Sequence, residues 1–341
     1  SDTNLSEMSN KEYNNYELMP LVSEESDLSK LDKAVLSSNN NFLIYYTTSG
    51  TNAITDGDAK NIANTLENVV SSYEKNYGLK FHYSPNLQES GFGSVAEVLS
   101  FGAFQQSTNK AAKVLLNSNI DTKYLDTAMP VFIIDTDVEN TNALGYYVPE
   151  ASIFNGFTKL IVRLFGESNA QTDSILTTYA FPYFVVSSTL DSFDDTKIIL
   201  AHELFHHYQA YICGDGSYGA CASGLFTTET TANFVASRNL DINMTGTPIN
   251  AHSTWYISDV SSSIDKVGLK NKGESALGYG AFVFAQNYDE VVPNGYNHLF
   301  QSMKYENPLK YISDNSDGNY KKALLLTAER NLTLDYNNKL Y

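Results

Sequence analysis

Two histidines, His202 and His206, lie four positions apart in the apolar segment 198–209, which has helical periodicity. Four residues advance a helix by about 400°, so both imidazoles stand on one face, one turn apart. Two imidazoles in this arrangement can share one tetrahedral zinc ion. Glu203 follows the first histidine, where its carboxylate can take a proton from a water molecule that the metal acidifies. The pattern therefore predicts a hydrolytic zinc site with its own general base.

The histidine pattern is unusual for a chain of this composition. The sequence contains six histidines, so a chance match is on the order of one in a few hundred. The alternative is a pair of buried histidines hydrogen-bonded to the backbone. His207 points about 100° away from His206, so we interpret it as a supporting or surface residue and not as a ligand.

A catalytic zinc ion needs a third protein ligand and an open fourth position. Glu229 follows His206 by 23 positions within the predicted helix 227–236, which leaves room for a loop and a return helix. The alternative for Glu229 is a solvated carboxylate on the helix surface. Asn233 lies one turn beyond Glu229, where it can accept the remaining N–H of a ligand histidine.

Two other carboxylates near the histidines compete with Glu229 for the metal. Asp215 lies in a Gly-containing loop, where a turn role explains it. Asp241 follows the second helix and would have to fold back. We therefore expect Glu229 to be the ligand.

Cys213 and Cys221 are the only cysteines, and seven residues separate them. A pair that closes so short a loop predicts a disulfide and an oxidising compartment, with two unrelated thiols as the alternative. A disulfide at this place would restrain the connection that carries Glu229. A loop cross-link with no bearing on catalysis is an equal alternative.

Candidates for further roles are less specific. An oxyanion donor would come from Tyr279 or His252, although a packing role also explains a tyrosine. The acidic alternation of Asp135, Asp137 and Glu139 offers oxygen ligands for calcium, and a solvated loop is the preferred interpretation.

The elements that must position these residues change character along the chain. Aromatic and β-branched runs predict strands, and a period of three to four predicts a helix that ends before Gly78. The predicted strands are 42–46, 130–134 and 182–187, the predicted helix is 56–77, and helical periodicity returns from Thr196. Strands and helices followed mostly by helices indicate an α+β fold with two lobes.

The chain divides into three predicted parts. Residues 1–35 are polar and acidic, which is typical of a flexible leader or tether, with a propeptide as the alternative. Residues 36–212 form the α+β lobe, which ends with the zinc-binding helix. Residues 213–341 form the mostly helical lobe, which carries the third ligand.

Composition excludes several classes of protein. With 22 basic and 39 acidic residues the net charge of the 341-residue chain is 22 − 39 = −17, which disfavours nucleic acid and anionic membranes as partners. An apolar fraction of 42% is too high for a disordered chain. No apolar run approaches the roughly 20 residues of a membrane span. We expect a globular monomer that acts on a protein or peptide.

The segment His202–His206, followed by Glu229, resembles the gluzincin metallopeptidases, the thermolysin-like branch of the zincins. The stretch 42–50 is similar to the start of bacterial secreted members, and the resemblance extends over about residues 40–300. It implies a two-lobed zincin fold and an edge strand at 183–187, against which an extended peptide adds as another strand. The family has Asp where this chain has Asn233.

The resemblance and the motif together predict a secreted or cell-surface zinc metalloendopeptidase. His202, His206 and Glu229 would bind zinc, Glu203 would be the base, and Tyr279 would assist. An aminopeptidase or another zinc hydrolase is the nearest alternative. A non-catalytic surface-binding protein with a zincin fold is the alternative from another class, although a purely structural site needs no base.

Overall fold

The computed structural model describes nine stretches of the chain. They are residues 30–83, 113–125, 127–135, 145–148, 183–189, 192–214, 221, 225–239 and 280–333. The chain divides into two compact units. The sheet unit contains the described residues up to His207 except Asn76–Gly78, and the helical unit contains Asn76–Gly78 and the described residues from Tyr208 onward.

The sheet unit is built on a mixed five-stranded sheet. Its strands are β1 (Lys33–Leu36), β2 (Phe42–Tyr46), β3 (Met129–Ile134), β4 (Gly145–Val148) and β5 (Tyr183–Ser187). Their order is β1-β2-β3-β5-β4. Strands β2, β3 and β5 run parallel to one another, whereas β1 and β4 pair antiparallel to their neighbours. The three strands expected from the sequence are confirmed.

The first strand begins inside the segment expected to be a leader. β1 pairs with β2 in the register Ala34↔Tyr45, and Leu31 and Ala34 are buried. Apolar contact with the sheet therefore orders the chain before residue 36. Residues 1–29 lie outside the described residues.

The expectation that 183–187 is the edge strand is wrong. β5 pairs with β3 on one side, Phe132↔Val185, and with β4 on the other, Tyr146↔Val185. Val185 and Val186 are both buried, as is typical of a strand covered on its two faces. On this side of the described sheet, β4 is the last strand.

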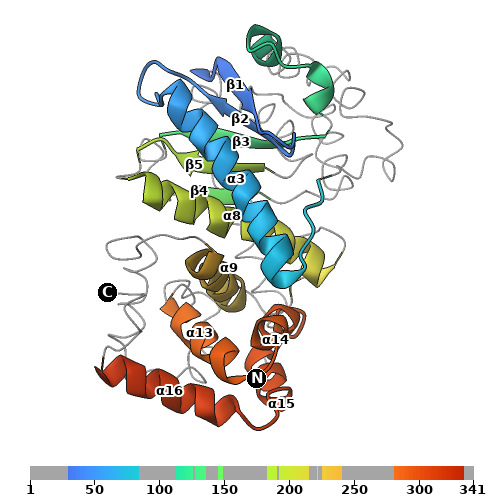
Figure 1. Ribbon diagram of the computed structural model, residues 1–341, viewed down its shortest axis with the longest axis vertical. Coiled ribbons are helices and arrows are strands. Elements are labelled where there is room, and N and C mark those ends of the chain that lie inside the picture. The colour runs from blue at the N-terminus through green and yellow to red at the C-terminus, as the bar shows by residue number, and fades with distance from the viewer. Residues whose placement is uncertain are drawn as a thin grey trace, which may run out of the picture. The chain divides into compact units, whose positions relative to one another are not determined.

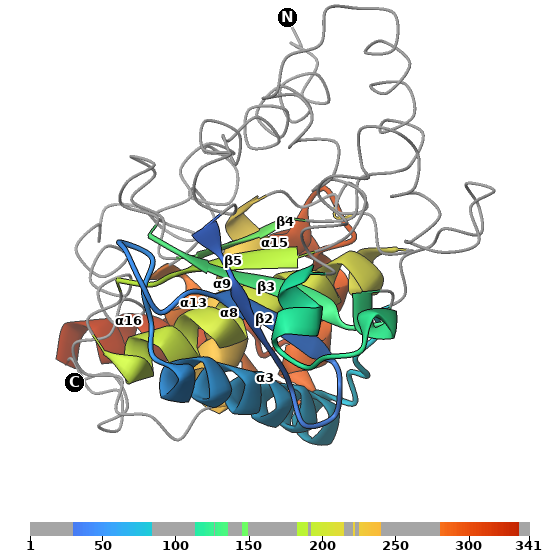
Figure 2. The ribbon, with the colours of Figure 1, turned by 90° about the horizontal axis from the view of Figure 1, so that it is seen from above.

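Two long helices cover one face of the sheet (Figure 2). Helix α3 (Asp56–Tyr77) begins with a capping box, in which the Asp58 N–H donates to Thr55 Oγ1 (3.0 Å) and the Thr55 N–H donates to Asp58 Oδ2 (3.2 Å). Helix α8 (Phe193–Cys213) packs beside it. A short 3₁₀ helix, η3, covers Thr122–Leu125.

The contact between α3 and α8 is made by a buried tyrosine. The Tyr73 hydroxyl donates to the Ala201 carbonyl at 2.7 Å, and the Tyr73 ring meets Phe205 edge-on at a centroid distance of 5.7 Å. All three residues are buried. Ala201 and Phe205 directly precede His202 and His206, so this contact fixes the helix that carries the histidines.

The helical unit is assembled around α13. Its helices are α9 (Leu225–Asn239), α13 (Phe282–Val291), α14 (Gly295–Ser302), α15 (Pro308–Asp314) and α16 (Tyr320–Thr333). α13 contacts α9, α14 and α16, and Figure 1 shows it between α9 and α16. Arg330 of α16 forms a two-pronged ion pair with Glu290 of α13, at 2.7 and 3.0 Å.

The described chain is thus α+β, with one mixed sheet and mostly helices otherwise, as the sequence predicts. None of the helices within the described stretches has the length and apolar character needed to cross a membrane.

Candidate metal centre

Residues 198–210 of helix α8 are all buried, so the middle of this helix lies in the core. The helix begins earlier than periodicity alone predicts, because Ser192 and Asp195 form a cap: the Asp195 N–H donates to Ser192 Oγ (3.1 Å), and Ser192 Oγ donates to Asp195 Oδ2 (2.8 Å). Leu200 and Leu204 are completely buried. The polar side chains in the middle of this helix are therefore held away from bulk water.

The two histidines of the motif converge as their spacing predicts. His202 Nε2 and His206 Nε2 lie 3.0 Å apart, and both side chains are 5% exposed. Two nitrogens on one tetrahedral zinc ion, each bonded at roughly 2.0–2.1 Å, lie about 3.3 Å apart. The observed separation is close to that value, so the pair can bind one ion.

Glu229 of α9 completes a group of three donors. The ligand atoms of His202, His206 and Glu229 all lie within 4.8 Å of one another, and all three residues are buried. Two imidazole nitrogens and one carboxylate oxygen could hold a metal ion, and a buried carboxylate argues against the solvated alternative. Asp215 and Asp241, the competing carboxylates, lie outside the described residues.

The predicted general base, Glu203, lies beside the strand β4. Glu203 is 5% exposed. A Cβ atom added to Gly145 would come within 3.3 Å of Glu203 Cγ and 2.6 Å of Ile199 Cγ2. The strand backbone thus passes against α8 at the level of the base, and only a glycine allows this approach. A glycine in a strand is the sequence signal for such contact, but β4 was not among the predicted strands.

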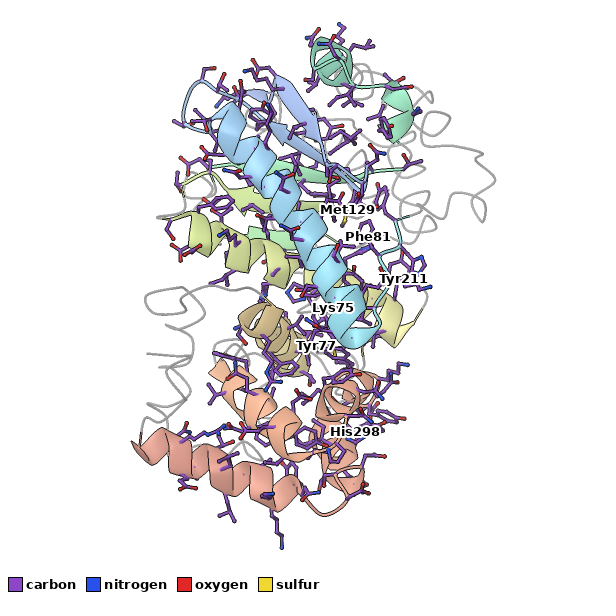
Figure 3. All side chains as sticks on the ribbon, in the orientation of Figure 1. Lys75, Tyr77, Phe81, Met129, Tyr211 and His298 are labelled. Carbon is purple, nitrogen blue, oxygen red and sulfur yellow. A yellow bond between two sulfur atoms is a disulfide. The ribbon has the colours of Figure 1, made fainter. Side chains whose placement is uncertain are left out.

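His207 is buried, with 1% of its surface exposed, so the surface interpretation is wrong. Its Nε2–H donates to the His82 carbonyl at 2.6 Å. Burial lowers the pKa of the imidazole to about 4, so the ring is neutral. The ring of Phe81, labelled in Figure 3, packs against the rings of His207 and Phe42, with centroid distances of 5.5 Å and 4.9 Å. His207 therefore attaches the segment after α3 to the core.

Gln209 is a second residue that the motif did not reveal. It is fully buried, and its Nε2 donates to the Thr228 carbonyl at 2.7 Å and to Thr231 Oγ1 at 2.8 Å. Both partners belong to α9. The signal for this role is its spacing of three residues after His206, which places it on the face that the histidines occupy.

Cys213 and Cys221 form a disulfide with a Cα–Cα distance of 5.0 Å. The bridge joins the last residue of α8 to the connection that leads to α9. Cys221 Sγ lies 3.7 Å from the Gln209 carbonyl oxygen, so Cys221 lies against the C-terminal part of α8.

The remaining predicted residues are only partly placed. Asn233 is fully buried one turn beyond Glu229, and its role toward a ligand histidine stays a prediction. Tyr279 and His252 lie outside the described residues, as do Asp137 and Glu139 of the proposed calcium site. The Asp135 N–H donates to Asn52 Oδ1 at 2.7 Å, which is a structural contact.

No protein-family model matches this chain, and no curated protein or solved structure is significantly similar to it.

Proposed function

We propose that this protein is a zinc-dependent metalloendopeptidase with a gluzincin-like, two-lobed arrangement. The observation that carries the proposal is the buried group of His202, His206 and Glu229, whose ligand atoms lie within 4.8 Å of one another. Two histidines and a glutamate form the donor set of one class of catalytic zinc site, and three ligands leave the fourth position open. When bound there, zinc acidifies a water molecule and polarises a carbonyl group.

Glu203 supplies the proton transfer that peptide hydrolysis requires. Its carboxylate accepts a proton from the attacking water as the new carbon–oxygen bond forms. It then delivers that proton to the leaving nitrogen as the peptide C–N bond breaks. A buried glutamate directly after a metal-ligating histidine suits this role, because a purely structural metal site needs no base.

The substrate is proposed to bind along β4. In the described part of the sheet, β4 is an edge strand. The edge of a sheet can accept an extended peptide as a further strand through main-chain hydrogen bonds. Gly145 places this strand against Glu203. A peptide that pairs with β4 would pass the base in mid-chain, which favours an endopeptidase over an aminopeptidase.

The disulfide supports a secreted or cell-surface location. Disulfides persist in oxidising compartments, and Cys213–Cys221 closes the loop between the two helices that carry the ligands. The net charge of −17 gives no reason to expect nucleic acid as a partner.

The test compares wild type with Glu203→Gln and with Glu74→Gln, a matched change at an exposed position of α3. The zinc content of each of the three proteins is measured, and so is its cleavage of a denatured protein substrate, with and without a chelator. We expect one zinc per chain in all three proteins and chelator-sensitive cleavage by wild type and Glu74→Gln. Turnover by Glu203→Gln should be lower by about 10²- to 10⁴-fold or more, because metal binding survives and proton transfer does not.

Substantial cleavage by zinc-loaded Glu203→Gln would overturn this mechanism. Stoichiometric zinc in wild type without any cleavage would favour the non-catalytic surface-binding protein instead.

A further inference from the structure

We propose that Gln209 is the positioning residue for the third metal ligand, Glu229. The inference rests on the proposed metal site and goes beyond its donor set. Gln209 binds no metal in this proposal. Gln209 fixes the axial position and the rotation of α9, and these direct the Glu229 carboxylate toward the histidine nitrogens.

Four residues of α8 lie in one row along the helix. His202, His206, Gln209 and Cys213 follow one another at intervals of four, three and four residues. At about 100° per residue these positions fall within a stripe about 60° wide. The histidines belong to the donor group with Glu229, Gln209 binds α9, and Cys213 is bonded to Cys221. The row therefore joins α8 to α9 or to the connection before it along four successive positions.

The orientation of the Gln209 amide is determined by its partners. The Thr228 carbonyl can only accept a hydrogen bond, so the nitrogen of the amide must face it. The Thr231 hydroxyl has a single hydrogen, which it donates to the Thr227 carbonyl at 2.8 Å. Thr231 Oγ1 therefore accepts the second amide hydrogen of Gln209. Both donors of the buried amide are satisfied by α9.

These two contacts lie on either side of Glu229. Thr228 directly precedes the ligand, and Thr231 follows it by two positions. A shift of α9 by one residue would move the carboxylate by about 1.5 Å along the axis and turn it by about 100°. A zinc–oxygen bond of roughly 2.0–2.2 Å does not tolerate such a shift. The two hydrogen bonds from the Gln209 amide to Thr228 and Thr231 therefore also fix the position of Glu229 between them.

The test measures zinc affinity by competition with a chromophoric chelator, together with thermal unfolding of the metal-free protein. Gln209→Met keeps the length and volume of the side chain and removes both donors. Gln286→Met is the matched control, because Gln286 of α13 donates to Ser237 Oγ (2.9 Å) at the far end of α9. We expect zinc affinity to fall about 10- to 100-fold in Gln209→Met, as for loss of other groups that orient a ligand, and to stay at the wild-type value in Gln286→Met.

A second pair of variants keeps the test independent of how well Gln209→Met folds. Thr231→Val removes the acceptor oxygen and should weaken zinc binding, whereas Thr231→Ser retains that oxygen and should restore it. In a Glu229→Ala background, Gln209→Met should cause no further loss of affinity, since the ligand through which it acts is gone.

Wild-type zinc affinity in Gln209→Met would overturn the proposal and leave the peptidase function standing. An equal loss in the Glu229→Ala background would also overturn it, because Gln209 would then act without Glu229. Activity of zinc-loaded Glu203→Gln, by contrast, would refute only the catalytic mechanism. Failure of wild type to bind zinc would overturn both.

Discussion

Gly145 of β4 has no room for a side chain, because Glu203 and Ile199 of α8 occupy the adjacent space. A Cβ at this position would lie 2.6 Å from Ile199 Cγ2 and 3.1 Å from the Val185 carbonyl oxygen, in addition to the approach to Glu203. Ile199 is buried, and its Cγ2 methyl is attached to a branched and conformationally restricted carbon. The close approach of β4 to Glu203 therefore requires a residue without a side chain at position 145.

We expect Gly145→Ala to lower both stability and turnover. The added methyl forces β4 and α8 apart, at a cost of about 1–3 kcal/mol for overpacking a core contact. Turnover should fall because the base moves relative to the strand proposed to bind substrate, whereas zinc content should be unchanged. Denaturant unfolding, metal analysis and kcat/KM check these three expectations.

Gly57→Ala is the matched control. The nearest atom to a Cβ at Gly57 is Thr55 Oγ1 at 3.5 Å, an ordinary contact, and the position lies in the first turn of α3. Alanine there should leave turnover unchanged and raise stability by up to about 1 kcal/mol. A Gly145→Ala protein with the stability and turnover of wild type would contradict the close packing.

Removal of Glu229, the proposed third ligand, should weaken zinc binding by orders of magnitude. Glu229→Ala takes away a buried carboxylate, and two histidines alone bind zinc less tightly than three ligands. Asp215→Ala and Asp241→Ala should leave zinc affinity nearly unchanged. Competition with a chelator compares the three variants, and a strong loss in either aspartate variant would transfer the ligand role away from Glu229.

The disulfide should be complete in protein isolated from its natural compartment. Thiol titration after denaturation without reductant should find no free thiol, and titration after reduction should find two. Replacement of both Cys213 and Cys221 by Ser should lower the free energy of unfolding by about 2–3 kcal/mol, the cost expected for opening so short a loop. Two reactive thiols in the unreduced protein would remove this support for export.

The histidine pair, the long helix α3 and three strands could be predicted because each is specified locally. A spacing of four places His202 and His206 together within one helix, whatever packs around it. The apolar period of α3 and the aromatic and β-branched runs of the strands are likewise contained in short windows of sequence.

Strand β4, the inner position of β5 and the contacts of Gln209 depend on segments that are distant in the sequence. β4 has only four residues, and although Tyr146, Tyr147 and Val148 favour a strand, so short a run does not stand out until its pairing with β5 is seen. That pairing in turn makes β5 an inner strand. Gln209 acquires its role from Thr228 and Thr231, about 20 positions later, and a single-helix pattern cannot show which side chains a second helix presents.

The hydroxyl of Tyr73 should contribute measurably to the position of α8. Tyr73→Phe removes only the hydrogen bond to the Ala201 carbonyl and keeps the ring against Phe205. Ala201 lies inside α8, where its carbonyl also accepts the helical bond, so no buried acceptor is left without a donor. The free energy of unfolding should therefore fall by about 0.5–1.5 kcal/mol, the net value of one hydrogen bond.

The matched control for Tyr73→Phe is Tyr305→Phe, because Tyr305 is 47% exposed and water can replace a partner of its hydroxyl. That change should leave stability within the error of the measurement. Zinc affinity should fall less in Tyr73→Phe than in Gln209→Met, since the Tyr73 hydroxyl donates to α8, whereas the Gln209 amide donates to the helix that carries Glu229. If Tyr73→Phe unfolds at the same denaturant concentration as wild type, the hydroxyl makes no net contribution and ring packing alone fixes α8. A loss of zinc affinity as large as that of Gln209→Met would instead show that the histidines, and not Glu229, are the part of the site that is most sensitive to helix packing.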